Sequence, residues 1–216
     1  MSINLALILT LLTLFTGIVM AMDVLVWKTA DQDSRAAPSA IATLVEYSRS
    51  FFPVLVFVLV IRSFVFEPFR IPSGSMKPTL VVGDFIFVKK FSYGLRLPVT
   101  EKKIIETGQP ERGDVVVFRL PSDPRINYIK RVIGLPGDEV SFERQRLTIN
   151  GVTMDLSSSS DFFEHAPVYV ENLDGRQHKV LIHDPGHSKR DGLYVIPEGQ
   201  YFVMGDNRDR SKDSRY

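Results

Sequence analysis

The sequence predicts a mostly β domain that is preceded by two membrane-spanning helices. Two apolar runs lie near the N-terminus, and the chain then changes to short β-prone segments separated by glycine and proline. With 216 residues, it is long enough for two membrane segments and one domain with its own core. We expect spans at residues 1–22 and 44–66, a loop at 23–43 and the domain at 67–216.

The first apolar run covers residues 3–22 and contains no charged side chain. A helix of this length reaches about 30 Å, which matches the hydrocarbon core of a membrane. A cleaved signal peptide is the alternative, but it would begin with basic residues and end in a small-x-small motif. No Lys or Arg precedes this run, and its end reads Val-Met-Ala-Met-Asp. A retained anchor with a short exterior N-terminus is therefore predicted.

The second apolar run covers residues 51–61 and is followed by Arg62 and an apolar segment at 64–66. Because Arg62 can extend its charge to the membrane interface, we expect one helix over about 44–66. Pro53 fits a helix that begins close to it. A helix lying in the membrane surface is the alternative, but its polar face would be too thin.

The basic residues near the helix ends predict the orientation. Lys28, Arg35 and Arg49 lie between the two runs, and no basic residue precedes the first run. Loops rich in Lys and Arg stay in the cytoplasm. We therefore expect residues 23–43 to be cytoplasmic, and the N-terminus and the domain after residue 66 to lie outside.

Composition excludes several kinds of chemistry. The net charge of +1, from 26 basic and 25 acidic residues, gives no reason to expect a nucleic acid partner. The absence of cysteine excludes a disulfide, a thiolate nucleophile and a cysteine-bound metal. His183 and His187 have the spacing of helical metal ligands, but Pro185 and Gly186 between them indicate a turn. We predict no metal site.

The exported part is expected to be built from short strands. Asn150-Gly151 predicts a hairpin, Pro136-Gly137 predicts a turn, and the serine-rich residues 157–160 predict an exposed loop. Residues 141–198 are expected to be a more variable β insertion. The predicted strands are residues 84–89, 114–118, 127–133, 147–149, 179–182, 194–196 and 201–204.

Residues 71–80 read Ile-Pro-Ser-Gly-Ser-Met-Lys-Pro-Thr-Leu and contain the first candidate for chemistry. Prolines restrain this segment, and glycine lets a ligand approach the backbone closely. Such a setting can present a serine as a nucleophile whose own N–H helps to hold an oxyanion. A rigid linker leaving the membrane is the alternative, and the pattern alone favours it.

Lys130 is the best candidate for the base that a serine nucleophile needs. In a strand over 127–133, alternation places Lys130 on one face with Tyr128 and Val132. Burial beside such neighbours would lower the pKa of the amine and let it accept a proton. An edge-strand lysine with its amine in water is the alternative, and periodicity does not choose between the two.

A third cluster covers residues 205–215, which read Gly-Asp-Asn-Arg-Asp-Arg-Ser-Lys-Asp-Ser-Arg. It follows a β-prone run and begins with turn-forming residues. One interpretation is a solvated polar turn. The other is a hydrogen-bonding loop that orients groups of an active site.

Taken together, these clusters resemble bacterial type I signal peptidase (leader peptidase). The resemblance covers the chain from about Phe52 onward. Its motifs, in the family's order, are residues 72–80, residues 112–118 (Arg-Gly-Asp-Val-Val-Val-Phe), residues 128–134 (Tyr-Ile-Lys-Arg-Val-Ile-Gly) and residues 205–215. It implies a β catalytic domain of the signal-peptidase type.

The resemblance implies a role for each matching residue. Ser75 is expected to be the nucleophile and Lys130, as a neutral amine, the general base. The Ser75 N–H and the Ser73 hydroxyl are expected to form the oxyanion hole, and Ser211 to orient the Lys130 amine. The supporting polar shell is expected to contain Arg131, Asp206, Asp213 and Arg215.

The resemblance also implies how substrate binds. Two shallow pockets are expected to take the small residues at positions −1 and −3 of an export signal. The strand that carries Lys130 is expected to pair with the extended substrate. The residues expected to line the pockets are Phe69, Ile71, Met76, Leu80, Tyr128 and Ile129.

The family's chemistry implies no metal and no cofactor. The implied partners are signal peptides of exported preproteins, membrane lipid and the protein-export machinery. The implied location is the bacterial cytoplasmic membrane, crossed more than once, with the catalytic domain on the extracytoplasmic side.

Three features differ from the fuller family pattern. Cysteine is absent, so the disulfide of some relatives cannot form, and Arg210 stands where an Asn is frequent. The chain ends at Tyr216, where relatives continue with further strands. We therefore expect the C-terminus of the domain to be incomplete.

Three other functions are compatible with parts of this pattern. A self-cleaving repressor-type Ser/Lys protease would carry a DNA-binding helix pair where this chain has membrane segments. An inactive membrane-anchored scaffold for binding or assembly would be expected to lack Ser75 or Lys130, and both are present. A relative dedicated to one specialised substrate stays open.

Overall fold

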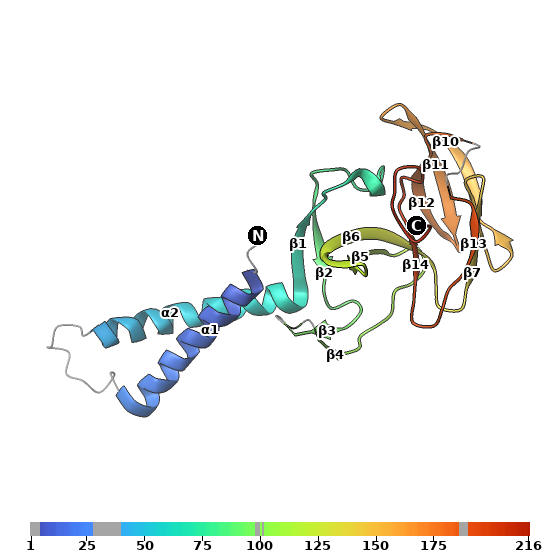
Figure 1. Ribbon diagram of the computed structural model, residues 1–216. Coiled ribbons are helices and arrows are strands. Elements are labelled where there is room, and N and C mark those ends of the chain that lie inside the picture. Colours follow the sequence, from blue (N-terminus) through green and yellow to red (C-terminus); the bar gives the residue numbers. More distant parts are fainter. Residues whose placement is uncertain (1–4, 28–39, 98–99, 101, 186–189) are drawn as a thin grey trace. The chain divides into compact units, whose positions relative to one another are not determined.

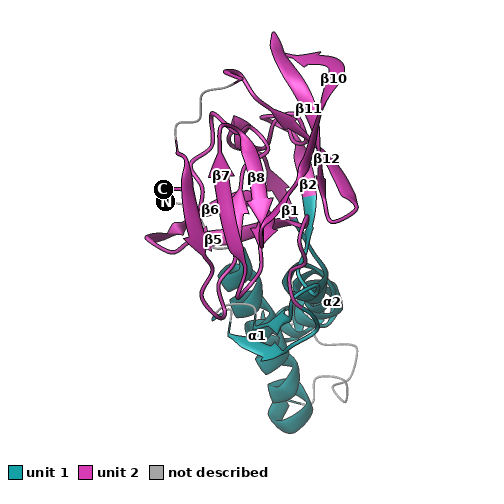
Figure 2. Ribbon diagram, turned by 90° about the vertical axis from the view of Figure 1, so that its right-hand side faces the viewer, with its two compact units in different colours: residues 1–67, 87–108 teal, residues 68–86, 109–216 magenta. Residues whose placement is uncertain are grey.

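Figure 1 shows the computed structural model of the chain, which describes residues 5–27, 40–97, 100, 102–185 and 190–216. The chain forms two compact units, one of residues 1–67 and 87–108 and the other of residues 68–86 and 109–216 (Figure 2). It passes between the units within β1 (Phe66–Arg70), within β2 (Phe85–Lys89) and again after residue 108. Strands β1 and β2 pair with each other.

The first unit contains two apolar helices. Helix α1 (Leu5–Met22) continues into a π-helical turn, η1 (Asp23–Trp27), and α2 (Ala40–Val60) continues into η3 (Ile61–Val65). At 23 and 26 residues, both are long and apolar enough to cross a membrane. The prediction of two such helices is confirmed. The boundaries of the spans stay predictions, and residues 1–4 and 28–39 lie outside the described part of the chain.

The expectation that the second helix begins close to Pro53 is wrong. Helix α2 begins at Ala40, so Pro53 lies in its interior. Proline removes one backbone donor from a helix. Helices in lipid tolerate this loss because other backbone groups and neighbouring helices satisfy the freed carbonyl.

The helices pack against each other, and two of their contacts involve a glycine and an ion pair. Gly17 of α1 lies against the ring of Phe52, so closely that a Cβ there would be 3.1 Å from a ring carbon. Arg49 of α2 donates a hydrogen bond to the buried Asp23 carboxylate in η1. A small residue allows close helix packing, and the ion pair ties the end of the first helix to the middle of α2. The remainder of this unit includes β3 (Leu95–Arg96), which pairs with β4 (Lys103–Ile105).

The second unit contains three antiparallel sheets (Figure 2). One has the order β14-β6-β5, with β5 (Val115–Leu120), β6 (Asp123–Gly134) and β14 (Phe202–Met204). Another has the order β13-β7-β8-β9, with β7 (Glu139–Glu143), β8 (Arg146–Ile149), β9 (Val152–Thr153) and β13 (Gly192–Val195). The third has the order β10-β11-β12, with β10 (Asp155–Phe163), β11 (Ala166–Leu173) and β12 (Arg176–Leu181).

One apolar core holds these sheets together. It is formed by the inward side chains of β6, β7, β8, β11 and β14 and of the loops beside them. Because strand side chains alternate between two faces, β7, β8 and β14 each give this core two residues that are two positions apart. Its buried members are Ile133, Val140, Phe142, Leu147, Ile149, Met154, Leu173, Ile196, Phe202 and Met204. The prediction of a mostly β domain is confirmed.

The seven predicted strands correspond to β2, β5, β6, β8, β12, β13 and β14. The hairpin at Asn150-Gly151 is also confirmed. It joins β8 to β9, with φ of 49° at Asn150 and 79° at Gly151. These left-handed conformations suit the twist of a two-residue hairpin.

The expectation of an exposed loop at residues 157–160 is wrong. These serines belong to β10, where Ser157 pairs with Val170 and Ser158 with Tyr169 of β11. Serine has little preference for strands, but β11 supplies backbone partners that override this preference. As β10 lies at the edge of its sheet, its polar side chains stay in contact with water.

A buried ion pair ties the last loop of the chain to β11. The guanidinium of Arg208, which is fully buried, donates two hydrogen bonds to the carboxylate of Glu171. Burial raises the pKa of Glu171, but Arg208 and His178 more than offset this effect and bring the pKa to about 2. The carboxylate therefore stays charged at neutral pH.

We expect Arg208→Met to lower the free energy of unfolding by about 3–5 kcal/mol, because it removes the guanidinium that neutralises the buried Glu171 carboxylate and leaves only His178 beside it. Urea unfolding of the detergent-solubilised chain, followed by circular dichroism, measures this loss. The double variant Arg208→Met/Glu171→Met removes both charges and should lose less than the single variant. A double variant at least as unstable as the single variant would contradict this account.

Candidate active site

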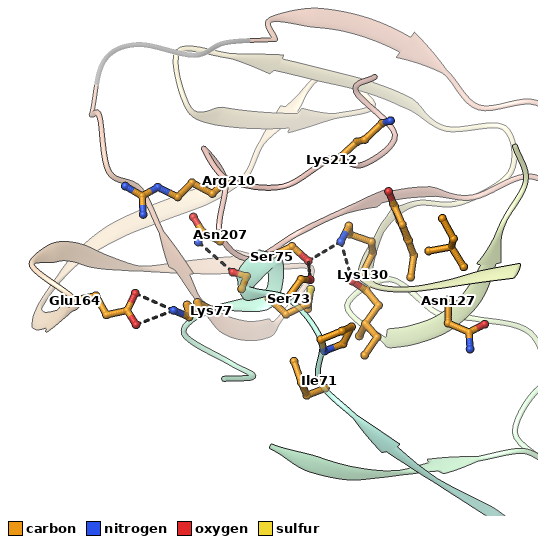
Figure 3. Close-up of a pocket in the computed structure, with 16 residues that line it drawn as sticks. Ile71, Ser73, Ser75, Lys77, Asn127, Lys130, Glu164, Asn207, Arg210 and Lys212 are labelled. Atoms are coloured by element: carbon orange, nitrogen blue, oxygen red, sulfur yellow. Dashed lines mark hydrogen bonds and ion pairs between the residues drawn. The ribbon is translucent and has the colours of Figure 1, made fainter. Parts of the chain in front are cut away.

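Ser75 lies in a single 3₁₀ turn, η4 (Gly74–Met76), between β1 and β2. Ser73 precedes the turn in an extended conformation, and its Oγ is 3.4 Å from Ser75 Oγ (Figure 3). At the start of a helical turn the backbone N–H groups have no acceptor within the turn. The Ser75 N–H is such a group, so the turn presents a hydroxyl together with a donor.

Lys130 reaches Ser75 from β6. Its Nζ is 2.7 Å from Ser75 Oγ and 3.0 Å from the backbone oxygen of Ile129, and it lies 5.0 Å from the centre of the Tyr128 ring (Figure 3). Lys130 is only 4% exposed, so the alternative of an amine in water is wrong. Burial lowers the pKa of Lys130 to about 8, although the carboxylates of Asp213 and Asp206 act in the opposite direction.

Asn207 fixes the position of η4, the turn Gly74–Met76 that carries Ser75 and is called the serine turn below. Sequence reasoning did not single out Asn207. Its side-chain amide donates to the Gly74 carbonyl, and its backbone N–H donates to the Ser75 carbonyl, both at 3.1 Å. Next to it, a Cβ on Gly205 would collide with the Ser75 carbonyl oxygen and with Ser211. Only a residue without a side chain lets the loop approach the turn this closely.

Asp206 and Arg131 form a buried ion pair beside Ser75 and Lys130, the two residues called the dyad below. Arg131 donates from two nitrogens to the two oxygens of Asp206, at 2.9 and 2.7 Å, and the hydroxyl of Thr79 donates to the same carboxylate. Arg131 directly follows Lys130, and Thr79 lies just after the serine turn. The ion pair therefore connects β6, which carries Lys130, to the segment that follows Ser75.

Asp213 and Arg215 form a second such pair. Arg215 donates to both oxygens of Asp213, at 2.8 and 2.9 Å, and Gly205 N–H donates to the same carboxylate. Burial raises the pKa of Asp213, but the guanidinium of Arg215 outweighs it, so the pKa lies below its usual value. The structure thus brings all four residues of the predicted polar shell around the two candidate catalytic residues.

Ser211 is also near the site. It is 5% exposed and lies against Gly205, close to the Ser75 carbonyl. The two hydrogen bonds of the Lys130 amine go to Ser75 and Ile129, not to Ser211. Its expected role in orienting the amine stays a prediction.

Five of the six predicted pocket residues meet in one apolar cluster beside the dyad. Ile71, Met76 and Ile129 are buried in it, and Phe69 and Leu80 pack against them. Ile86 and Val117 complete the cluster, and the sequence did not point to either. The sixth predicted residue, Tyr128, lines the cavity separately, with its ring edge-on to Phe118.

The dyad opens into a cavity of about 500 Å³. Apolar side chains of the cluster and residues 126–129 of β6 form one part of its wall. Charged side chains that sequence reasoning missed, Lys77, Glu164, Arg210 and Lys212, form another. In the part of the chain that the structure describes, no three His, Cys, Asp or Glu side chains are grouped as they would be to bind a metal. His187, of the proposed histidine pair, lies outside the described residues.

Comparison with known proteins identifies a family to which this chain is similar. Residues 44–216 match the family described as signal peptidase, peptidase S26. The chain belongs to this family. It is 48% identical to a signal peptidase I of Pseudomonas fluorescens, a match that covers 100% of this chain and 83% of that protein. It is 53% identical to a signal peptidase I of Pseudomonas aeruginosa, over 80% of this chain and 63% of that protein.

A crystal structure of a signal peptidase I from Enterococcus faecalis V583 is also similar, at 29% identity over 50% of this chain and 86% of the other, with a TM-score of 0.32. A TM-score this low carries no argument about the fold. The sequence relationships support a membrane signal peptidase, which is a serine endopeptidase, and do not favour the inactive scaffold.

We expect Asn207→Ala to reduce turnover by roughly 10²-fold, because the serine turn loses the amide that holds its Gly74 carbonyl and shifts away from Lys130. Steady-state cleavage of a preprotein measures turnover. Asn172→Ala, which removes a hydrogen bond to the backbone of Gly175 in another hairpin, is the matched control and should keep its turnover. Equal turnover in the Asn207 variant and in the control would show that Asn207 does not position the serine.

We expect cleavage to rise with pH and to level off above about pH 8. Only neutral Lys130 can accept the Ser75 proton, and the neutral fraction increases as the pH passes the lowered pKa. Well below that pKa, kcat/KM should fall about ten-fold for each pH unit. A pH profile measured on one preprotein tests this, and a rate that stays constant from pH 6 to 9 would argue against a lysine base.

Proposed function

We propose that this chain cleaves the signal peptides of exported preproteins, with Ser75 as nucleophile and Lys130 as general base. The observation that carries the proposal is the 2.7 Å distance between Lys130 Nζ and Ser75 Oγ in a setting that lowers the pKa of the amine. A serine hydroxyl is a weak nucleophile until a neighbouring base takes its proton. A neutral lysine at this distance is such a base.

The reaction follows from these positions. Ser75 Oγ attacks the scissile carbonyl while its proton moves to Lys130 Nζ. The tetrahedral intermediate collapses, Lys130 gives the proton to the departing amine, and the signal peptide stays attached to Ser75 as an ester. Water then loses a proton to Lys130 and attacks the ester, which frees the signal peptide and restores the serine hydroxyl.

The developing oxyanion has two candidate donors, the Ser75 N–H in the serine turn and the Ser73 hydroxyl directly before it. The 3.4 Å between the two hydroxyl oxygens supports this assignment, because a carbonyl attacked by Ser75 would come within reach of Ser73. Donors placed at the developing charge stabilise the transition state more than the substrate.

Substrate binding is supported by the apolar cluster and by β6. The cluster around Ile71, Met76 and Ile129 lies beside Ser75 and suits small apolar side chains of the signal peptide. Strand β14 pairs with β6 at residues 131–134. Over 127–130, that edge of β6 has no partner among the strands that the structure describes. An extended substrate could pair there.

The membrane arrangement is part of the proposal. The two apolar helices would cross the bacterial cytoplasmic membrane, residues 23–43 would lie in the cytoplasm and the catalytic domain would lie outside. This orientation rests on the sequence, because Arg49 lies within α2, where it pairs with Asp23, and Lys28 and Arg35 lie outside the described residues. The further partners that we propose are membrane lipid and the protein-export machinery, which delivers preproteins to the outer face.

Three variants test the mechanism on a purified preprotein in detergent. We expect Ser75→Ala and Lys130→Ala to abolish cleavage, and Ser73→Ala to slow turnover by about 10²–10³-fold through the loss of one oxyanion donor. Lys179→Ala, whose side chain pairs with Asp161 away from the cavity, is the control and should cleave normally. Near-normal cleavage by Lys130→Ala would remove Lys130 from the mechanism, and unchanged turnover in Ser73→Ala would assign the oxyanion hole to other groups.

The membrane orientation has a separate test, which the absence of native cysteine makes simple. We expect Ser157→Cys, in the exposed edge strand β10, to react with a membrane-impermeant maleimide in spheroplasts. Ser34→Cys, in the loop between the spans, should react only after the membrane is opened. The opposite labelling pattern would reverse the proposed orientation.

A further inference from the structure

The cavity at the dyad is unevenly charged. Besides Lys130, its wall contains the cationic side chains of Lys77, Arg210 and Lys212 and a single carboxylate, that of Glu164. Three cations against one anion leave an excess of two positive charges. The mechanism does not use any of these four residues.

One of these cations is already neutralised. Lys77 donates to both oxygens of Glu164, at 2.6 and 2.8 Å, and its Nζ lies 5.8 Å from the centre of the Phe163 ring. Glu164 lies in the turn between β10 and β11, so the ion pair holds this turn next to the serine turn. Lys77 is largely covered, with 16% of its side chain exposed, and has little capacity for a second carboxylate.

Arg210 is in the opposite situation. It is exposed, it lines the cavity, and in the described part of the chain its guanidinium makes no hydrogen bond or ion pair. Glu164 is near enough for the charge of Arg210 to contribute to the lowered pKa of that carboxyl, after Lys77. Because Glu164 is bound to Lys77, the guanidinium of Arg210 remains available to a carboxylate from outside, which it can bind with two parallel hydrogen bonds.

The position of Arg210 indicates which part of a substrate it meets. In Figure 3, Lys77, Glu164, Asn207 and Arg210 lie on one side of Ser75, whereas Lys130 and Asn127 of β6 lie on the other, and Ile71 lies beyond Ser73. Under the proposed function, the signal peptide occupies the side of Ile71 and β6. The chain beyond the scissile bond, which is the start of the mature protein, then leaves across the charged side.

We propose that Arg210 makes the enzyme prefer preproteins with an acidic side chain in the first residues after the cleavage site. This inference rests on the proposed function and adds a specificity determinant to it. A carboxylate there meets an unpaired guanidinium, whereas a Lys or Arg there is repelled by the same charge. Attraction of one substrate and repulsion of another together set the specificity.

The test uses three preproteins that share one signal peptide and differ only at the second residue of the mature part, which is Asp, Asn or Lys. The full chain in detergent cleaves each, and the readout is the ratio of kcat/KM for Asp to kcat/KM for Lys within one enzyme variant. A partly misfolded variant loses rate on all three substrates but keeps this ratio. The ratio therefore isolates the charge effect.

We expect the unmodified enzyme to prefer Asp over Lys by about five-fold or more at low salt, and less at high salt, because exposed charge pairs are weak and screened. Arg210→Gln should bring the ratio closer to one, Arg210→Glu should invert it, and Arg210→Lys should keep most of it. Arg146→Gln changes the net charge equally on β8, away from the cavity, and should keep the full ratio.

Two outcomes would overturn the inference. Equal kcat/KM for the three substrates in the unmodified enzyme would show that charge after the cleavage site is not recognised. A preference that persists in Arg210→Glu would assign recognition to another residue. Neither outcome affects the proposed function, which fails only if the unmodified chain does not cleave even the Asn preprotein, and in that case the inference fails with it.

Discussion

The catalytic geometry depends on one buried polar segment, residues 206–208. Its three consecutive side chains bind three different parts of the domain. Asp206 pairs with Arg131 beside the base, Asn207 holds the carbonyl of Gly74 in the serine turn, and Arg208 pairs with Glu171 in β11. The backbone of the same segment bonds to Leu181 at the end of β12. Buried polar groups need such partners, so the segment has little freedom to move.

The ion pairs around the dyad also explain why Lys130 can be neutral. Two carboxylates, Asp206 and Asp213, lie near enough to favour the charged amine. Each of them already binds a guanidinium through both oxygens, from Arg131 and Arg215 respectively. Their attraction for a further positive charge is therefore reduced, and the desolvation of the amine prevails. The supporting arginines thus contribute to the reactivity of a lysine that they do not touch.

The cavity combines two kinds of surface because different elements build its walls. The apolar part comes from the chain around the serine turn and from β6, which pack against each other. The charged part comes from Lys77 directly after the serine turn, from the β10–β11 turn and from the loop that ends the described chain. A protease for signal peptides benefits from this division, since its substrate changes from an apolar export signal to a polar mature protein at the scissile bond.

The sequence by itself determined the two apolar helices, seven of the strands and the four motifs that contain Ser75 and Lys130. These features depend on local chain properties, namely length, periodicity and turn residues such as Asn150 and Gly151. The sequence did not determine whether Lys130 was buried, and it predicted a loop where β11 pairs with the serines of β10. It pointed to the polar loop 205–215 but did not show that Asn207 holds the turn of Ser75, or that Arg210 lines a charged wall of the cavity. Burial and strand pairing depend on contacts between residues far apart in the chain, so only the tertiary structure decided them.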